Sequence, residues 1–301
     1  MNHHFYSHLA LFVVALIYGA NYSIAKLLLD PGFIGPNAFV FFRVLFAALI
    51  FLCITRCLFI YEKKDILLLF ICGFSGIIGN QLLFFNGLKN TSPVHAALLM
   101  VCTPILVLLI KFLQGQSLSK KQWLGCLIGL TGAVYIVLAR ANVQHTKSGI
   151  LGDLMVFANA LLYGYYLVKV PALITKYGAF HVMTALFSIS VLPVSALAYH
   201  ELDHIQFTSF GNEEWFTFSF VLIATTFGAY ALNAYALKHS DPSLVSVYIY
   251  LQPLIGTLIA LITGKDKWNW AYLVSGLLIF TGLFLSNKKN LAFSKKFQQA
   301  N

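Results

Sequence analysis

The chain has few charged residues. Asp, Glu, Lys and Arg make up only 10% of its 301 residues, whereas hydrophobic residues make up 59%. Soluble globular proteins carry about 25% charged residues. No polar stretch here is long enough to fold as a separate soluble domain. The composition therefore excludes an ordinary soluble enzyme and indicates a helical protein that crosses a membrane several times.

Reactive and metal-binding motifs are also missing. The five cysteines all lie in apolar stretches and do not resemble a disulfide framework or a zinc site. The sequence has no Walker A loop, no H-E-x-x-H and no G-x-S-x-G. We therefore expect no cofactor, no metal and no catalytic residues, and ATP-driven pumping by this chain alone is disfavoured.

Acidic residues are almost absent from the apolar stretches, with Asp153 at the edge of one of them. An ion site built from several carboxylates is therefore disfavoured, and proton coupling through an intramembrane acid has no clear candidate. This pattern favours a uniporter or an exchanger.

The hydropathy pattern predicts an all-α integral membrane protein, because it contains ten runs close to the roughly 20 residues that a bilayer-crossing helix needs. The first run has neither the basic start nor the cleavage site of a signal peptide, so we expect it to be retained. The predicted spans are 8–28, 37–59, 66–87, 94–113, 123–139, 151–170, 180–199, 216–236, 243–263 and 270–286.

The distribution of Lys and Arg predicts the orientation. With the N-terminus in the cytoplasm, inner loops and the tail hold thirteen of these residues, whereas outer loops and span ends hold six. This bias predicts cytoplasmic N- and C-termini. It accounts for most of the net charge of +10 without a nucleic-acid partner. The basic tail, 288–301, is expected to lie near anionic lipid headgroups.

The chain repeats itself. Residues 88–93 read LKNTSP and residues 237–242 read LKHSDP, and a second proline follows the last residue of each block by eleven positions, at Pro104 and Pro253. The two blocks are 149 positions apart and each repeat unit holds five spans. Because five is odd, the second copy crosses the membrane in the opposite direction. Inverted repeats of this kind are typical of transporters with a site between the halves.

Further pairs support the repeat and carry a resemblance. Tyr18-Gly19 pairs with Tyr163-Gly164, and Thr131-Gly132 pairs with Thr281-Gly282. Two five-span halves with proline in the fourth span, followed by spaced glycines, resemble the EamA-type family of the drug/metabolite transporter superfamily. Arg43 in the second span also resembles the family pattern. The resemblance implies one EamA-type repeat over 1–142 and a second over 149–287.

One position departs from that family. Members often place Glu directly after the glycine that ends the fourth span of each half, whereas Gln116 and Lys265 stand there in this chain. A role of that glutamate is therefore not carried over.

Polar residues inside the spans are the candidate substrate-binding residues. Several recur at helical spacing and so share a face. Either these stripes line a central cavity, which we favour for the first and sixth spans, or they form hydrogen bonds between helices, an alternative that stays equally open for the third and eighth spans. They are Tyr18, Asn21 and Tyr22 in the first span, Asn80, Gln81 and Asn86 in the third, Asn159, Tyr163 and Tyr166 in the sixth, and Thr226, Tyr230 and Asn233 in the eighth.

Arg43 and the ninth span leave alternatives open. Arg43 either extends its side chain to the outer interface or lines a vestibule where it binds a carboxylate. In the ninth span, Tyr248 and Gln252 lie almost opposite the face that carries Tyr250 and Thr257. We favour Tyr248 and Gln252 for the cavity. The sequence predicts packing kinks at Pro104 and Pro253, whereas Lys26, Lys111 and Lys169 are predicted to be anchors at span ends.

These observations predict a secondary transporter of the bacterial inner membrane that exports amino acids or related small metabolites by alternating access. The expected partners are a small-molecule substrate and the lipid bilayer, with a homodimer as a further expectation. Two other classes stay open: a membrane scaffold or sensor without transport, and a lipid-modifying membrane enzyme. An aromatic-rich cavity would suit hydrophobic or aromatic solutes.

Overall fold

The computed structural model describes residues 3–29, 31–56, 61–91, 93–141, 149–205, 207–262 and 268–287. Within these ranges the regular structure is entirely helical. The predicted basic tail, 288–301, lies outside the described residues. The first half of the chain contains α1 (His3–Ile24), α2 (Lys26–Leu29), α3 (Pro36–Thr55), α4 (Lys63–Gly73), η1 (Phe74–Ile78), α5 (Gly79–Asn90), α6 (Pro93–Met100), α7 (Thr103–Leu113) and α8 (Lys120–Ala141).

The second half follows the same order of helices. It contains α9 (Ile150–Tyr177), α10 (Ala179–Leu202), η2 (Phe207–Ser209), α11 (Asn212–Phe220), η3 (Val221–Gly228), α12 (Ala229–His239), α13 (Pro242–Val247), η4 (Tyr248–Tyr250), α14 (Leu251–Ile262) and α15 (Trp270–Asn287).

The helices account for the apolar runs of the sequence. Among the described residues, seven helices are long and apolar enough to cross a membrane, and Thr103–Leu113 and Trp270–Ser286 are shorter apolar helices. Large apolar side chains such as Leu192, Ile262 and Leu277 are exposed on the outside of the bundle. A protein with this surface is stable in lipid rather than in water.

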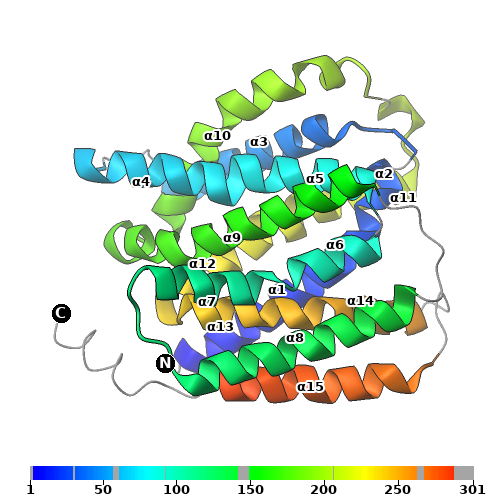
Figure 1. Ribbon diagram of the computed structural model, residues 1–301. Coiled ribbons are helices and arrows are strands. Elements are labelled where there is room, and N and C mark those ends of the chain that lie inside the picture. The colour runs from blue at the N-terminus through cyan, green and yellow to red at the C-terminus, as the bar shows by residue number, and fades with distance from the viewer. Residues whose placement is uncertain are drawn as a thin grey trace.

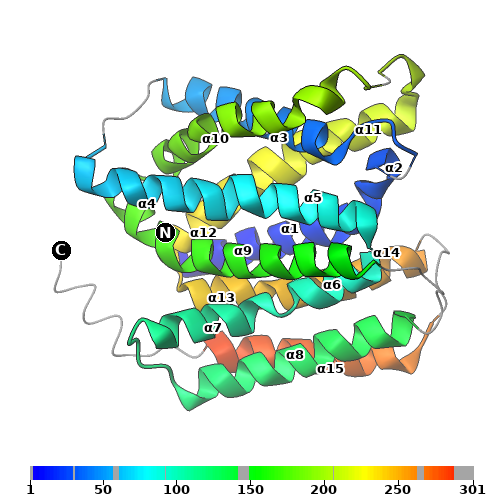
Figure 2. The same cartoon turned by 45° about the horizontal axis from the view of Figure 1, so that its top comes forward.

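The two halves exchange neighbours, which means that helices of each half pack on helices of the other half. The first helix of the first half, α1, packs on α12 and α14 of the second half, whereas α9 packs on α5, α6 and α7 of the first. Corresponding helices also pair directly, α3 with α10 and α8 with α15. Figures 1 and 2 show the pair α3 and α10 on one side of the bundle and the pair α8 and α15 on the other. This arrangement fits two structural repeats.

Both halves have a π-helical segment in their third apolar run. The segment η1 joins α4 to α5, and η3 joins α11 to α12. A π-helical turn changes the backbone hydrogen-bond pattern and is frequent at functional sites. In this protein the hydroxyl of Tyr230, just after η3, donates a hydrogen bond of 2.8 Å to the carbonyl of Gly76 in η1. The two irregular segments are therefore joined directly.

Both halves also interrupt the helix just before the second proline of the repeat unit, Pro104 in the first half and Pro253 in the second. Helix α6 ends at Met100 and α7 begins at Thr103, whereas the 3-10 turn η4 separates α13 from α14. Pro104 and Pro253 lack the N–H that would bond to the carbonyl four residues earlier. The structure therefore has a helix break or a 3-10 turn where the sequence predicts kinks.

Glycines allow α8 and α15 to approach closely. A Cβ atom on Gly282 would lie 2.6 Å from the carbonyl oxygen of Gly125 and 2.6 Å from the backbone nitrogen of Gly129. Backbone atoms cannot move aside as a flexible side chain can, so this contact requires glycine. Small residues at such spacing are typical of helix pairs in membranes.

Candidate functional site

A cavity lies among helices from both halves. Its volume is about 70 Å³, which is room for a few water molecules and is small for a ligand site. A larger solute would require the helices to separate. Its walls come from α1, α3, α5 and α6 of the first half and from α9, α12 and α14 of the second. The lining residues are Tyr18, Asn21, Tyr22, Arg43, Asn80, Gln81, Phe84, Phe85, Met100, Asn159, Tyr163, Tyr230 and Gln252.

Most of the site residues named from the sequence meet at this cavity. Residues of the stripes predicted on the first and sixth spans line it, and amides from the third and ninth spans add to the polar wall. Five of the named residues do not line it, namely Asn86, Tyr166, Thr226, Asn233 and Tyr248. Asn86 donates a hydrogen bond to Asn37, and Thr226 donates one to the carbonyl of Val221.

Arg43 is buried and lines the cavity. Its side chain does not extend to the outer interface, because the residue is only 3% exposed. Its guanidinium carbon lies 4.5 Å from the centre of the Phe85 ring. This cation–π contact stabilises the charge, but the Nε and Nη1 atoms are buried without a hydrogen-bond partner. The vestibule alternative therefore agrees with the position of Arg43.

Gln81 and Tyr230 connect the two halves. The Gln81 Nε2 atom donates to the Tyr230 hydroxyl oxygen over 3.3 Å, while that hydroxyl donates its own proton to Gly76. The Oε1 atom of Gln81 is buried and has no partner. The contact thus fixes one end of the amide and leaves the acceptor available.

Three further hydrogen bonds join helices at the cavity. The hydroxyl of Tyr22 in α1 donates to Gln252 Oε1 in α14 over 3.1 Å. The Nδ2 atom of Asn80 in α5 donates to Asn159 Oδ1 in α9 over 2.5 Å. Asn159 in turn donates to the sulfur of Met100. Each bond links one half to the other, so the polar stripes serve both as cavity wall and as contacts between helices.

The residues away from the cavity have clear positions. Tyr166 stacks on Tyr163 with ring centres 6.0 Å apart, and Asn233 donates to the Tyr163 hydroxyl over 3.3 Å. Both therefore pack behind a lining residue. Tyr248 instead contacts His8 in α1 over 2.5 Å. Tyr248 and Gln252 therefore both contact α1, but only Gln252 lines the cavity.

Sequence reasoning missed the apolar part of the wall. Phe84, Phe85 and Met100 line the cavity but were not among the predicted residues. Phe84 and Phe85 follow Gln81 by three and four positions and so share its helical face, which is the signal that could have identified them. Phenylalanine occurs 27 times in this chain, so composition alone does not distinguish these two.

The charge of the cavity is unbalanced. Arg43 is the only Lys, Arg, His, Asp or Glu among the lining residues. Within the described part of the chain, no group of three or more His, Cys, Asp or Glu residues is placed to hold a metal ion. The lining thus offers hydrogen-bonding side chains and one positive charge.

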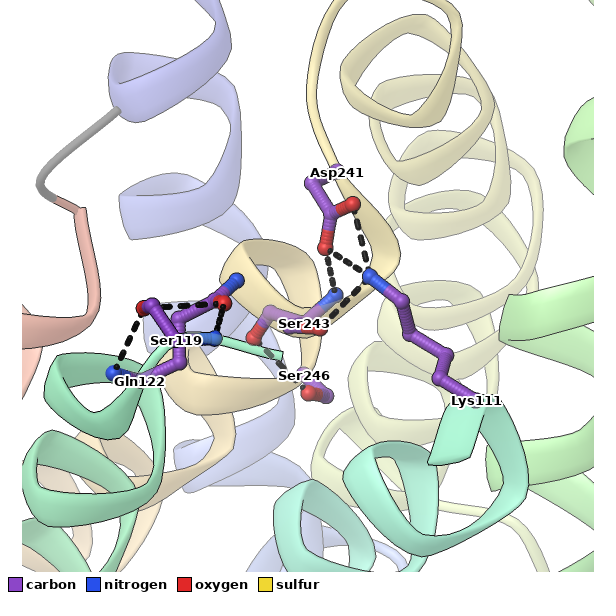
Figure 3. A network of polar contacts seen from close by, with 6 residues as sticks. All are labelled: Lys111, Ser119, Gln122, Asp241, Ser243 and Ser246. Atoms are coloured by element: carbon purple, nitrogen blue, oxygen red, sulfur yellow. Dashed lines mark hydrogen bonds and ion pairs between the residues drawn. The ribbon is translucent and has the colours of Figure 1, made fainter. Parts of the chain in front are cut away.

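Ion pairs join the halves near the ends of α7 and α9. Lys111 at the end of α7 lies 2.7 Å from Asp241 and 3.0 Å from the Ser243 hydroxyl at the start of α13 (Figure 3). The sequence predicts a headgroup anchor at Lys111, and this is wrong, because the side chain is buried against the other half. Lys176 of α9 pairs with Glu62 and Asp65 at the start of α4, each over 2.6 Å.

Near the start of α3 and the end of α5, Glu201 and Lys26 form hydrogen bonds to backbone groups. The carboxylate of Glu201 in α10 accepts hydrogen bonds from the backbone N–H groups of Asn37 and Ala38 at the start of α3, over 2.7 and 2.9 Å. Such a carboxylate satisfies N–H groups that have no partner within the helix. Lys26 donates to the carbonyls of Leu88 and Thr91 instead of lying free as an anchor.

Comparison with known proteins gives consistent results. The sequence profile of the EamA-like transporter family matches residues 5–138 and 150–288. An uncharacterized transporter of Archaeoglobus fulgidus is 23% identical, over 94% of this chain and 98% of its own length. The aromatic amino acid exporter YddG of Ancylobacter novellus is 27% identical, over 70% of this chain and 72% of its own.

Two other similarities extend over most of the chain. A WAT1-related protein of Arabidopsis thaliana is 23% identical over 92% of this chain and 84% of its own. A solved crystal structure aligns with a TM-score of 0.71 at 21% identity, covering 93% of this chain and 95% of the other. The structural likeness concerns the fold. The profile covers nearly the whole chain in two copies, and this protein belongs to the EamA-like transporter family of multi-pass membrane proteins.

Proposed function

We propose that this protein is a secondary transporter that exports amino acids or related small metabolites, with the central cavity as its substrate site. The observation that carries the proposal is a buried polar cavity whose walls come from both halves of the chain. Two relatives are named as exporters, of aromatic amino acids and, probably, of terminal-alkyne amino acids, which supports the substrate class. The protein acts by moving its substrate and is not an enzyme.

We further propose the architecture and location that such a mechanism requires. The chain forms ten transmembrane helices in two inverted five-helix repeats, 1–142 and 149–287, in the bacterial inner membrane with both termini in the cytoplasm. The exchange of neighbours between the halves supports this arrangement. Transport proceeds by rocking of the halves around the cavity. The absence of acidic residues from the lining favours uniport or exchange. The homodimer stays a prediction.

The test is metabolite release. Cells that express the native chain are compared with cells that express a Tyr163→Ala/Gln252→Ala variant at equal membrane levels, and the medium is analysed by mass spectrometry. Accumulation of a few amino acids or related metabolites with the native chain only supports export through the cavity. Equal metabolite concentrations in the two media contradict export. Reduced membrane levels of the variant would assign the polar stripes to helix packing.

A further inference from the structure

Four buried polar atoms at the cavity wall lack a partner. They are two nitrogens of Arg43 (Nε and Nη1), Asn21 Oδ1 and Gln81 Oε1. The other buried polar atoms without partners in the described ranges are hydroxyl oxygens that do not line the cavity. A buried polar atom without a hydrogen bond costs free energy. Their concentration at one cavity indicates a ligand that supplies the missing partners.

The donor side of this set is cationic. The guanidinium of Arg43 has no carboxylate near it among the lining residues, and its contact with the Phe85 ring does not supply a hydrogen-bond acceptor. A buried cation without a counter-ion is costly in a membrane interior. A carboxylate group would neutralise the charge and accept from the free nitrogens.

The acceptor side is neutral, and hydrogen bonds determine the orientation of the Gln81 amide. The hydroxyl of Tyr230 donates its only proton to the Gly76 carbonyl, so its oxygen can only accept a hydrogen bond from Gln81 Nε2. The amide of Gln81 therefore keeps Nε2 toward Tyr230 and Oε1 without a partner. Asn21 Oδ1 is a second free carbonyl-type acceptor at the same cavity. Two such oxygens suit an ammonium group, which has donors and no acceptor.

We propose that the cavity binds the zwitterionic group of an α-amino acid, with its carboxylate on Arg43 and its ammonium on Asn21 and Gln81. Phe84 and Tyr163 then border the amino acid's side chain. This inference rests on the proposed function, since it names the chemical group that the same cavity recognises. It excludes organic amines, which carry a cation toward Arg43, and it separates amino acids from simple carboxylic acids through the two acceptors.

The test measures binding to the purified full chain by its thermal stability. Each of the twenty amino acids is titrated, and the one that binds best is compared with its decarboxylated amine and its deaminated acid. A ligand that binds only the folded state raises the melting temperature by an amount that grows with the ratio of its free concentration to its dissociation constant. We expect the amine to bind about thirtyfold more weakly or worse, because it leaves Arg43 unpaired, and the acid about tenfold more weakly.

Variants test the same assignment from the protein side. Arg43→Gln is expected to abolish the preference for the amino acid over its amine, and Arg43→Lys to retain part of it, because lysine keeps the charge but not the planar fork. Gln81→Leu is expected to remove the preference over the deaminated acid. Asn86→Leu is the control, because Asn86 lies on the same helix, α5, with its amide bonded to Asn37 and not at the cavity.

The outcomes separate this inference from the proposed function. Binding of none of the twenty amino acids, or equal binding of the amine and the amino acid, overturns the inference even if proteoliposomes transport another solute. Binding that requires Arg43, without flux in proteoliposomes, supports the inference and contradicts transport. If Arg43→Gln does not fold, the comparison of the three ligands on the native protein still decides the question.

Discussion

Lys111 and Asp241 form an ion pair of 2.7 Å between the two halves of the protein. The lysine side chain is only 4% exposed and the aspartate side chain is 32% exposed. Asp241 also accepts from the backbone nitrogen of Ser243 and so caps α13. One carboxylate therefore both starts a helix of the second half and neutralises a buried lysine of the first.

Removing Lys111 should destabilise the protein more than removing a surface lysine. We expect Lys111→Met to lower the free energy of unfolding by about 1–3 kcal/mol, because the pair is partly buried and Asp241 loses its counter-ion. The matched control is Lys64→Met, whose pair with Glu62 is exposed and is expected to contribute less than about 1 kcal/mol. Thermal unfolding in detergent measures both. Equal shifts for the two variants would contradict a structural role for the Lys111 pair.

Acid should weaken the other ion pair between the halves. Hydrogen bonds from Lys176 and then from Lys64 hold the pKa of the Glu62 carboxyl below its ordinary value. A carboxyl with a lowered folded-state pKa contributes stability above its unfolded-state pKa, about 4.3 for Glu, and loses it as the pH falls through the folded-state value. We expect a small loss of melting temperature below about pH 4.3 that Glu62→Gln reduces. If the melting temperature of this variant depends on pH as that of the native protein does, Glu62 does not contribute to the acid sensitivity.

Because α8 and α15 approach closely, we expect substitution of Gly282 to be harmful and substitution of Gly276, on the same helix, to be tolerated. Gly282→Ala places a Cβ atom against the backbone of Gly125 and Gly129, so we expect a loss of about 1–3 kcal/mol or failure to reach the membrane. Gly276→Ala on the same helix meets only Leu254, at 3.8 Å, and should be tolerated. Membrane levels and melting temperatures of the two variants check this contrast. A tolerated Gly282→Ala would show that the helices do not approach this closely.

Tyr230 should affect ligand binding beyond its effect on stability. Tyr230→Phe removes the hydroxyl that orients Gln81 and bonds to Gly76, so we expect the substrate affinity to fall about fivefold, equivalent to about 1 kcal/mol. Tyr250→Phe is the control, because its hydroxyl donates to the Cys126 carbonyl on α8, away from the cavity. Both variants should lower the melting temperature, but only the first should lower the affinity. If Tyr230→Phe binds the substrate as tightly as the native protein does, the contact between Tyr230 and Gln81 does not contribute to binding.

Much of the fold could be predicted from the sequence, because a membrane helix can be identified from a local run of apolar residues. Within the described residues, helical segments lie in each predicted apolar range, and both halves interrupt the helix just before Pro104 and Pro253. Tyr18 and Tyr163, chosen because Tyr-Gly occurs in both copies, line one cavity. Helical spacing was sufficient here because both tyrosines lie in regular α-helix.

Other positions depended on tertiary contacts that local patterns do not contain. Lys111 resembles a headgroup anchor until Asp241, 130 residues away, is placed beside it. Tyr248 was predicted to line the cavity with Gln252, but its hydroxyl contacts His8 in α1 and it does not line the cavity. The free acceptor of Gln81 follows from Tyr230 and Gly76, which belong to different halves.

The central claim, that solute passes through the cavity, can be tested by blocking it. On a background without cysteine, Phe84→Cys is placed in the wall, and amino acid flux from proteoliposomes is measured before and after reaction with a small methanethiosulfonate. Leu192→Cys, on the lipid-facing surface, is the control. The account predicts that modification stops flux through the Phe84→Cys protein, that reduction restores it, and that the control is unaffected. Undiminished flux after complete modification of Phe84→Cys would contradict the account.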